Sequence, residues 1–427
     1  MVAQVSKPAV PPTSKSAAVR CGPAGLETCG TADLEVCATL NRYAALATLV
    51  IGCLTVLASD CAAQNPVKTP DYQAALDALQ RVKDQFAPDS HLAIFEVNAR
   101  QDGNTVVLQG EVDNAAARQA ALAAVKAAAF RVRDQIAVLP EDDLGGRVWG
   151  LATLSLVNLR EKPGNASELG TQAFMGNVLR LWKTQTNWFL VQTPDRYLGW
   201  TEGGAFIPCT RKEAEAWQSA PLLIVTALEE RILQQPSADA PQVSDVVLCD
   251  LVKRVGTEGD WFKVALPDGR AGYVPKSAAT DYAQWQKDRR PTPENIEHTA
   301  RSFMGRPYFW GCNSARGLDC SGFTKLVYYL NGIELDRNAA QQCRQGVEVP
   351  LDEGLKNLKK GDLLFFGRPD RRTGGERITH VGIYLQDKLF IQSSVLVHES
   401  SLDPDSPLAD RRRIRSLLHA RRVLPDP

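Results

Sequence analysis

The sequence lacks the features that mark several large classes of protein. Its 427 residues carry 49 basic and 49 acidic side chains, so the formal charge is zero and no electrostatic attraction to nucleic acid is expected. There is no glycine-rich phosphate loop and no cluster of metal ligands, and the ten cysteines contain no CxxC pair. We therefore expect no nucleic-acid partner, no metal and no cofactor.

Histidine is also scarce, with five in the whole chain. A catalytic base therefore has few candidates: His91, His298, His380, His398 and His419. Apart from Cys320, the cysteines in the C-terminal two thirds could be buried thiols or could form a disulfide, and buried thiols are the favoured interpretation for Cys209, Cys249, Cys312 and Cys343.

One cysteine stands at the start of a predicted helix. In "GLDCSGFTKLVYYL" the apolar residues Phe323, Leu326, Val327 and Leu330 follow helical spacing. The preceding Asp319 is a good N-cap, and "NG" after Leu330 is a stop signal. Cys320 therefore lies in the first turn, where backbone N–H groups and the helix dipole favour a thiolate. The pattern predicts a lowered thiol pKa and a candidate nucleophile.

A candidate base follows in "THVGIYLQDKLFIQSS", which alternates like a β-hairpin. A hairpin centred on Gln386 sets Gln392 directly opposite His380, close enough for the side chains to touch. Thiol, imidazole and polar orienter are the three groups of nucleophilic cysteine catalysis. His398 is an alternative orienter.

These motifs resemble the NlpC/P60 family of papain-like cell-wall peptidases. The resemblance is carried by "PYFWGCNSARGLDCSGF", "KKGDLLFFG" and "ITHVGIYLQDKLFIQSS", in that order. It implies a nucleophile at Cys320, a base at His380 and a polar third residue at Gln392. That third residue is most often histidine in the family. Glutamine can accept the imidazole N–H but carries no charge.

Before the catalytic region we expect three smaller modules. Residues 66–140 read as helix, strand, strand, helix, strand, and "VVLQGEVDNAAARQAAL" resembles a BON domain. An internal repeat follows, in which "WFLVQTPDRYLGW" returns as "WFKVALPDGRAGYV". Both copies resemble bacterial SH3 domains, small β-barrels expected at 148–207 and 220–280, and the catalytic domain is expected at 290–425. The fold class is α+β multidomain.

The resemblance to two-SH3 members of the family also implies substrate contacts. In such members the first barrel walls the active-site cleft, and an acid in an "SEL" loop and a tyrosine before "xGW" meet the free amine of the substrate. Glu168 and Tyr197 match these positions. Tyr197 has Arg270 as its counterpart in the second copy, so the repeat does not require a tyrosine there. Three further residues are implied to line the cleft: Tyr308, Asp319 and Ser321.

Two terminal segments complete the prediction. "NRYAALATLVIGCLTVLASDCAAQ" reads as a signal peptide cleaved near Ala63, after an extension without periodicity; residues 1–63 thus form an extension and signal peptide. This implies an extracytoplasmic protein with no membrane span after cleavage. The basic tail "RRRIRSLLHARRVL" is expected to be a solvated closing strand.

The sequence thus predicts a secreted, monomeric peptidase acting on peptidoglycan-derived peptides. By the resemblance, it would hydrolyse the γ-D-glutamyl-L-diamino acid bond of stem peptides with a free N-terminal L-Ala. Two alternatives stay open at this point: a related papain-like amidase or acyltransferase, and a wall-binding scaffold whose peptidase domain is weak or inactive.

Overall fold

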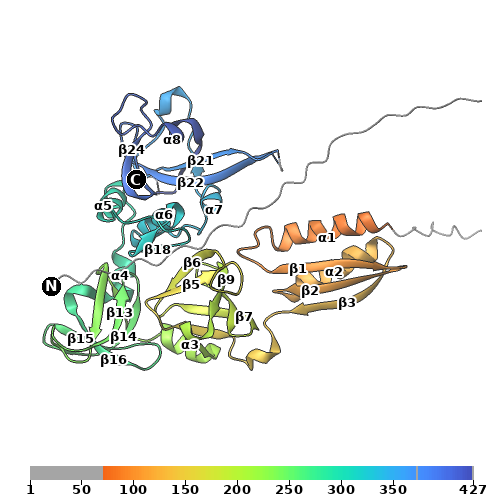
Figure 1. Cartoon of the computed structure of the whole chain (residues 1–427), viewed down its shortest axis with the longest axis horizontal. Coiled ribbons are helices and arrows are strands. Elements are labelled where there is room, and N and C mark those ends of the chain that lie inside the picture. Colours follow the sequence, from red (N-terminus) through yellow and green to blue (C-terminus); the bar gives the residue numbers. More distant parts are fainter. Residues whose placement is uncertain (1–70, 372–373, 426–427) are drawn as a thin grey trace, which may run out of the picture. The chain divides into compact units, whose positions relative to one another are not determined.

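The computed structural model describes residues 71–371 and 374–425 (Figure 1). The predicted extension and signal peptide at 1–63 lie outside the described residues, as do the first residues of the module expected at 66–140. Among the described helices, none combines the length and the apolar character that a bilayer crossing requires.

The first module has the predicted order of elements. A three-stranded sheet pairs β1 with β2 antiparallel and β2 with β3 parallel, and two helices pack on it. Its elements are α1 (Tyr72–Phe86), β1 (Phe95–Asp102), β2 (Thr105–Val112), α2 (Ala115–Ala127) and β3 (Arg131–Val138). The alanine-rich face of α2 buries Ala117, Ala121 and Val125, which share a core with Val106 and Leu108 of β2. Small side chains let this helix approach the sheet closely.

The internal repeat folds into two seven-stranded sheets with one shared topology. The first has the order β10-β4-β7-β8-β9-β5-β6, and the second has β17-β11-β14-β15-β16-β12-β13. The first comprises β4 (Trp149–Ala152), β5 (Leu156–Arg160), β6 (Leu169–Phe174), β7 (Val178–Gln185), β8 (Trp188–Gln192), β9 (Leu198–Glu202) and β10 (Phe206–Cys209). The second comprises β11 (Leu222–Val225), β12 (Glu229–Leu233), β13 (Gln242–Val247), β14 (Leu251–Glu258), β15 (Trp261–Ala265), β16 (Ala271–Pro275) and β17 (Ala279–Asp281).

A close approach of strands explains the glycine that both copies share. A Cβ on Gly199 would lie 2.8 Å from the Cβ of Leu159. A Cβ on its counterpart Gly272 would lie 2.6 Å from the carbonyl oxygen of Leu233. In both sheets the neighbouring strand leaves no room for a side chain at this position, so close packing explains why both copies of the repeat have glycine there. Two helices follow the sheets: α3 (Arg211–Gln218) and α4 (Tyr282–Asp288).

The C-terminal part combines a six-stranded antiparallel sheet, of order β20-β25-β21-β22-β23-β24, with helices. The helices are α5 (Pro293–Ser302), α6 (Cys320–Leu330), α7 (Ala339–Gln342) and α8 (Arg411–Ser416). The strands are β18 (Asn313–Ser314), β19 (Gly317–Leu318), β20 (Val347–Glu348), β21 (Leu363–Pro369), β22 (Glu376–Tyr384), β23 (Leu389–Ser394), β24 (Leu396–Ser401) and β25 (Leu417–Arg422).

Helix α6 packs against β22 and β23 of this sheet. Phe323 and Val327, on its predicted apolar face, share a buried core with Phe365 and Val381. This packing sets the N-terminus of α6 beside the strand that carries His380.

The hairpin between β22 and β23 differs from its predicted register. Ile383 pairs with Ile391, so the hairpin is centred on Asp387 and not on Gln386. Asp387 and Lys388 form the turn with φ values of 50° and 63°, as a tight hairpin turn requires. The partner of each residue therefore shifts by two positions. A shift of two keeps every side chain on its predicted face, because side chains alternate with a period of two.

Candidate active site

Cys320 is the first residue of α6 and is 7% exposed. The predicted N-cap is confirmed: the Asp319 carboxylate accepts the backbone N–H of Gly322 at 2.7 Å. A Cβ on Gly322 would lie 2.3 Å from the carbonyl oxygen of Cys312, so a glycine two residues after the thiol lets the helix start pack closely. The cysteines at 209, 249, 312, 320 and 343 are free thiols, and three of the four outside the candidate site are buried.

The electrostatic environment of Cys320 differs from the prediction. Burial, and then the Asp319 carboxylate, raise the pKa of Cys320 to about 11. Backbone N–H groups of Val381 and Ser321 and the Arg337 guanidinium favour the thiolate, but they do not overcome burial. The predicted lowering of the thiol pKa is therefore wrong for this structure, and Cys320 is a protonated thiol at neutral pH.

His380 lies on β22 immediately before Val381 and is 5% exposed. Its Nε2 atom lies 2.7 Å from Oε1 of Gln392. Burial, followed by the nearby Arg413 guanidinium, lowers the pKa of His380 to about 3. The imidazole is therefore neutral at neutral pH, so the candidate nucleophile and the candidate base are both uncharged.

The Gln392 side chain is completely buried, and both ends of its amide are bonded. Its Oε1 accepts from Nε of Arg413 at 3.1 Å as well as contacting His380. Its Nε2 donates to Oγ of Ser400 at 2.8 Å and to Oδ2 of Asp410 at 3.2 Å. The buried position of Arg413 shows that the prediction of a solvated tail is wrong at this residue.

The alternative orienter, His398, does not contact His380. It pairs with Gln392 in the β23–β24 register, but its Nδ1 lies 2.9 Å from the carbonyl oxygen of Leu396. His380 and Gln392 are therefore the pair that the fold brings together.

A buried ion pair supports the start of α6. The Asp319 carboxylate accepts hydrogen bonds from Nη2 of Arg337 at 2.5 Å and from Nη1 at 3.1 Å. Arg337 is 2% exposed. Nε of Arg337 also donates to Oγ1 of Thr171 on β6, at 3.0 Å. Arg337 was not predicted, because nothing in "LDRNAAQQ" marks an arginine that returns to the active-site helix.

Two further predicted residues lie beside this pair. The Ser321 hydroxyl accepts a hydrogen bond from Arg337 at 3.1 Å and donates one to Asp319 at 3.3 Å, so its hydrogen-bond partners are protein side chains. Tyr308 is half-buried, and its pKa is raised by burial and then by the nearby Cys320 and Asp319. Tyr308, Asp319 and Ser321 are thus gathered around Cys320.

Glu168 and Tyr197 belong to the first seven-stranded sheet and its loops. The Glu168 carboxylate accepts Nε1–H of Trp310 at 2.7 Å, in the loop that precedes Cys320. Tyr197 is 2% exposed, donates its hydroxyl to Glu161 at 3.3 Å and stacks on His91 at 5.2 Å. The proximity of Glu161 and His91 to Tyr197 was not predicted, since it depends on contacts between distant segments.

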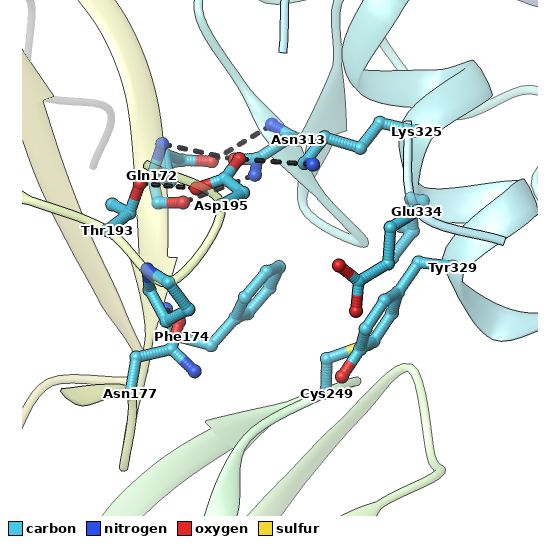
Figure 2. Close-up of a pocket in the computed structure, with 12 residues that line it drawn as sticks. Gln172, Phe174, Asn177, Thr193, Asp195, Cys249, Asn313, Lys325, Tyr329 and Glu334 are labelled. Atoms are coloured by element: carbon cyan, nitrogen blue, oxygen red, sulfur yellow. Dashed lines mark hydrogen bonds and ion pairs between the residues drawn. The ribbon is translucent and has the colours of Figure 1, made fainter. Parts of the chain in front are cut away.

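A cavity of about 160 Å³ lies near these residues, and Figure 2 shows its lining. Asp195 forms an ion pair with Lys325 of α6 at 3.0 Å, and Gln172 of β6 exchanges hydrogen bonds with Asn313. Cys320 and His380 are not among the lining residues. These contacts connect the segment that carries Tyr197 to the helix that carries Cys320. We therefore interpret the cavity as part of a structural contact between these two segments.

Within residues 71–371 and 374–425, no group of three or more His, Cys, Asp or Glu side chains is arranged to hold a metal ion.

Comparison with known proteins gives two domain matches. Residues 305–408 match the NlpC/P60 family, and residues 159–203 match the bacterial dipeptidyl-peptidase Sh3 domain. The first match contains Cys320, His380 and Gln392, and the second contains Glu168 and Tyr197.

Individual relatives match more than half of the chain. The chain is 28% identical over 269 residues to a gamma-D-glutamyl-L-lysine dipeptidyl-peptidase of Bacillus cereus, covering 61% of this chain and 77% of the relative. It is 26% identical over 275 residues to dipeptidyl-peptidase 6 of Lysinibacillus sphaericus, covering 59% and 91%.

A crystal structure of an NlpC/P60 family protein from Bacillus cereus shares the fold. Its TM-score is 0.55 at 23% identity, with 65% of this chain and 100% of that chain covered. The matched peptidase domain and the relatives define a hydrolase of the cysteine peptidase class. Residues 305–408 are thus similar to an NlpC/P60 peptidase domain, and a region similar to a bacterial SH3 domain lies ahead of it at 159–203.

Proposed function

We propose that this protein hydrolyses the γ-D-glutamyl-L-diamino acid bond of peptidoglycan stem peptides. The observation that carries the proposal is the buried Cys320, with His380 on the adjacent strand and Gln392 bonded to the His380 ring at 2.7 Å. The similarity to a gamma-D-glutamyl-L-lysine dipeptidyl-peptidase of Bacillus cereus supports this substrate class.

In the proposed reaction Cys320 attacks the γ-carbonyl carbon of D-glutamate. Because Nε2 of His380 is bonded to Gln392, Nδ1 is left to take the thiol proton as the C–S bond forms. Since thiol and imidazole are both neutral at rest, proton transfer accompanies attack. The backbone N–H of Cys320, at the start of α6, is the proposed donor to the oxyanion.

The same imidazole completes the turnover. His380 returns the proton to the amine of the diamino acid as the C–N bond breaks, which leaves a thioester on Cys320. A water molecule then attacks the thioester while His380 accepts its proton. The proton returns to sulfur as the acyl product, L-Ala-γ-D-Glu, leaves.

We propose that the substrate carries a free N-terminal L-Ala. Glu168 and Tyr197 come from the SH3-matched region, and the Glu168–Trp310 hydrogen bond joins that region to the loop before Cys320. Glu161, bonded to Tyr197, adds a second carboxylate that favours an ammonium group. Such a preference implies the trimming of released wall fragments.

We propose a BON-like module at 66–140, SH3-like barrels at 148–207 and 220–280, and a catalytic domain at 290–425. The enzyme would work outside the cytoplasm as a monomer, on peptidoglycan-derived peptides.

The test is direct. Purified protein is incubated with L-Ala-γ-D-Glu-diaminopimelate, and the products are analysed by mass spectrometry. L-Ala-γ-D-Glu and free diaminopimelate are expected, and Cys320→Ala should produce neither. Hydrolysis by the alanine variant would overturn the assignment of the nucleophile, and no hydrolysis by the native protein would overturn the substrate class.

A further inference from the structure

The Gln392 amide could in principle face His380 in either of two ways. With Oε1 toward the ring it accepts from Nε2–H, and Nδ1 is then free to accept a proton. With the amide rotated by half a turn, its NH₂ group would face Nε2 and would favour the tautomer protonated on Nδ1. That tautomer cannot take a proton from a thiol through Nδ1. Activity therefore depends on which end of the amide faces the ring.

Two charged groups from the C-terminal segment discriminate between these orientations. Arg413 offers only donors, and its Nε lies 3.1 Å from Oε1 of Gln392. Asp410, as a carboxylate, offers only acceptors, and its Oδ2 lies 3.2 Å from Nε2 of Gln392. The rotated amide would face a donor with a donor and an acceptor with an acceptor. The Ser400 hydroxyl can serve in either orientation, so it does not discriminate.

Arg413 is held firmly enough to act in this way. It is 6% exposed, and its guanidinium lies over the ring of Phe366, 5.4 Å from the centroid. Phe366 in turn packs against the His380 ring at 5.8 Å. Asp410 is the N-cap of α8 and accepts the backbone N–H of Arg413 at 3.0 Å, which fixes the two charged groups relative to each other.

We propose that Arg413 and Asp410 are positioning residues of the catalytic centre: together they fix the Gln392 amide so that His380 stays in the tautomer that can deprotonate Cys320. This inference rests on the proposed function and assigns a role to a segment that the sequence presented as a solvated tail. The uncharged Gln392 amide has no preferred orientation by itself, and Arg413 and Asp410 supply that preference.

The arrangement also has an electrostatic consequence. The polar and charged groups that act on His380 are Gln392 from β23 and Arg413, Arg412 and Asp410 from the segment of α8. Cys320 lies at the start of α6, which packs against the strand of His380. Arg413 is the principal cation among them and opposes protonation of the ring. Removing that charge should raise the pKa of His380 and move the acid limb of the pH profile upward.

The first experiment reads the tautomer without requiring turnover. ¹⁵N-histidine is incorporated into the full chain carrying Cys320→Ala, and the ring nitrogens are observed by NMR with and without Arg413→Met. With Arg413 present, His380 should show one neutral form protonated on Nε2. With Arg413→Met, a mixture of tautomers is expected. Unchanged ring signals would overturn the proposal, even if the enzyme proved inactive on every peptide tried.

The second experiment uses turnover of the otherwise native chain. Arg413→Met should lower kcat about tenfold or more with little change in KM, and should shift the acid limb of kcat/KM to higher pH. Arg413→Lys, which keeps the charge without the planar fork, should keep the acid limb near its native position but recover kcat only in part. Arg415→Met is the matched control, because Arg415 is exposed on the same helix and should leave both quantities unchanged.

A folding defect is separated from a positioning defect in two ways. Thermal unfolding is measured for each variant, and Asp410→Asn is added because asparagine preserves the helix cap but not the pure acceptor. Asp410→Asn should also lower kcat and add the second tautomer. Native kcat and an unshifted acid limb in folded Arg413→Met and Asp410→Asn proteins would overturn the proposal.

Discussion

Asp319 and Arg337 form a buried, two-point ion pair directly at the start of the helix that carries Cys320, with Nη2 and Oδ2 2.5 Å apart. Water has little access to either side chain, since Arg337 is 2% exposed and Asp319 is 6% exposed. Because Asp319 also caps α6 and accepts the backbone N–H of Gly311 at 2.9 Å, the pair connects the helix start to the preceding loop.

Arg337→Met should therefore destabilise the protein by about 3–5 kcal/mol, because it leaves a carboxylate buried without its counter-ion. The measurement is the free energy of unfolding from denaturant titration. Arg211→Ala is the control: its pair with Glu215 is exposed and should contribute less than about 1 kcal/mol. Equal effects of the two substitutions would contradict the importance of the buried pair.

The neutral state of Cys320 and His380 predicts the pH dependence. The pKa of Cys320 is raised to about 11, so iodoacetamide should label it slowly at neutral pH, with a rate that rises as the thiolate forms toward alkaline pH. The pKa of His380 is lowered to about 3, so the ring stays unprotonated as the pH falls from neutral toward that value. We therefore expect kcat/KM to stay level over this range and to fall only where the ring becomes protonated.

Mass spectrometry of the labelled peptides identifies the modified cysteine, and Cys320→Ala serves as the blank. Rapid labelling of Cys320 at pH 6 would instead indicate a thiolate–imidazolium pair at rest. That outcome would restore the lowered thiol pKa that the helix-start motif predicts.

Gln392→Ala should lower kcat about tenfold or more, roughly 1.4 kcal/mol per tenfold, because the His380 ring loses its orienting acceptor. The substitution also leaves the Nε–H of Arg413 without its acceptor, so thermal unfolding must be measured alongside. Gln386→Ala, at an exposed position beside the turn of the same hairpin, should leave kcat unchanged. Full activity of Gln392→Ala together with a loss in His398→Ala would assign the orienting role to His398.

The proposed amine preference predicts a difference between two peptides. The native enzyme should have a higher kcat/KM for L-Ala-γ-D-Glu-diaminopimelate than for its N-acetyl form, which carries no cation for Glu168 to meet. Glu168→Gln should reduce cleavage of the free peptide and narrow that difference. Glu202→Gln is the control, since Glu202 is exposed at the end of β9 in the same sheet. Equal kcat/KM values for both peptides in the native enzyme would refute the preference and return Glu168 to a surface role.

Much of the candidate site followed from local patterns. Helical spacing and an N-cap were enough to place Cys320 at the start of α6, because both depend on neighbours within one turn. Alternation was enough to put His380 and Gln392 on one face of a hairpin. The centre of that hairpin was misplaced by one residue, yet the pairing of faces survived, since a shift of two positions conserves the side of the sheet.

What the sequence by itself determined is therefore the choice of candidate reacting groups and the elements that carry them, together with the repeat whose two copies share one strand order. Only the tertiary structure decided their charge and their supports. Burial in the C-terminal part keeps Cys320 and His380 neutral, whereas a helix start alone favours a thiolate. Arg337 and Arg413 reach the site from segments that look polar in sequence. A long cationic side chain shows no local pattern that distinguishes a solvated position from a buried, paired one, because that difference depends on which distant carboxylate or amide the fold brings against it.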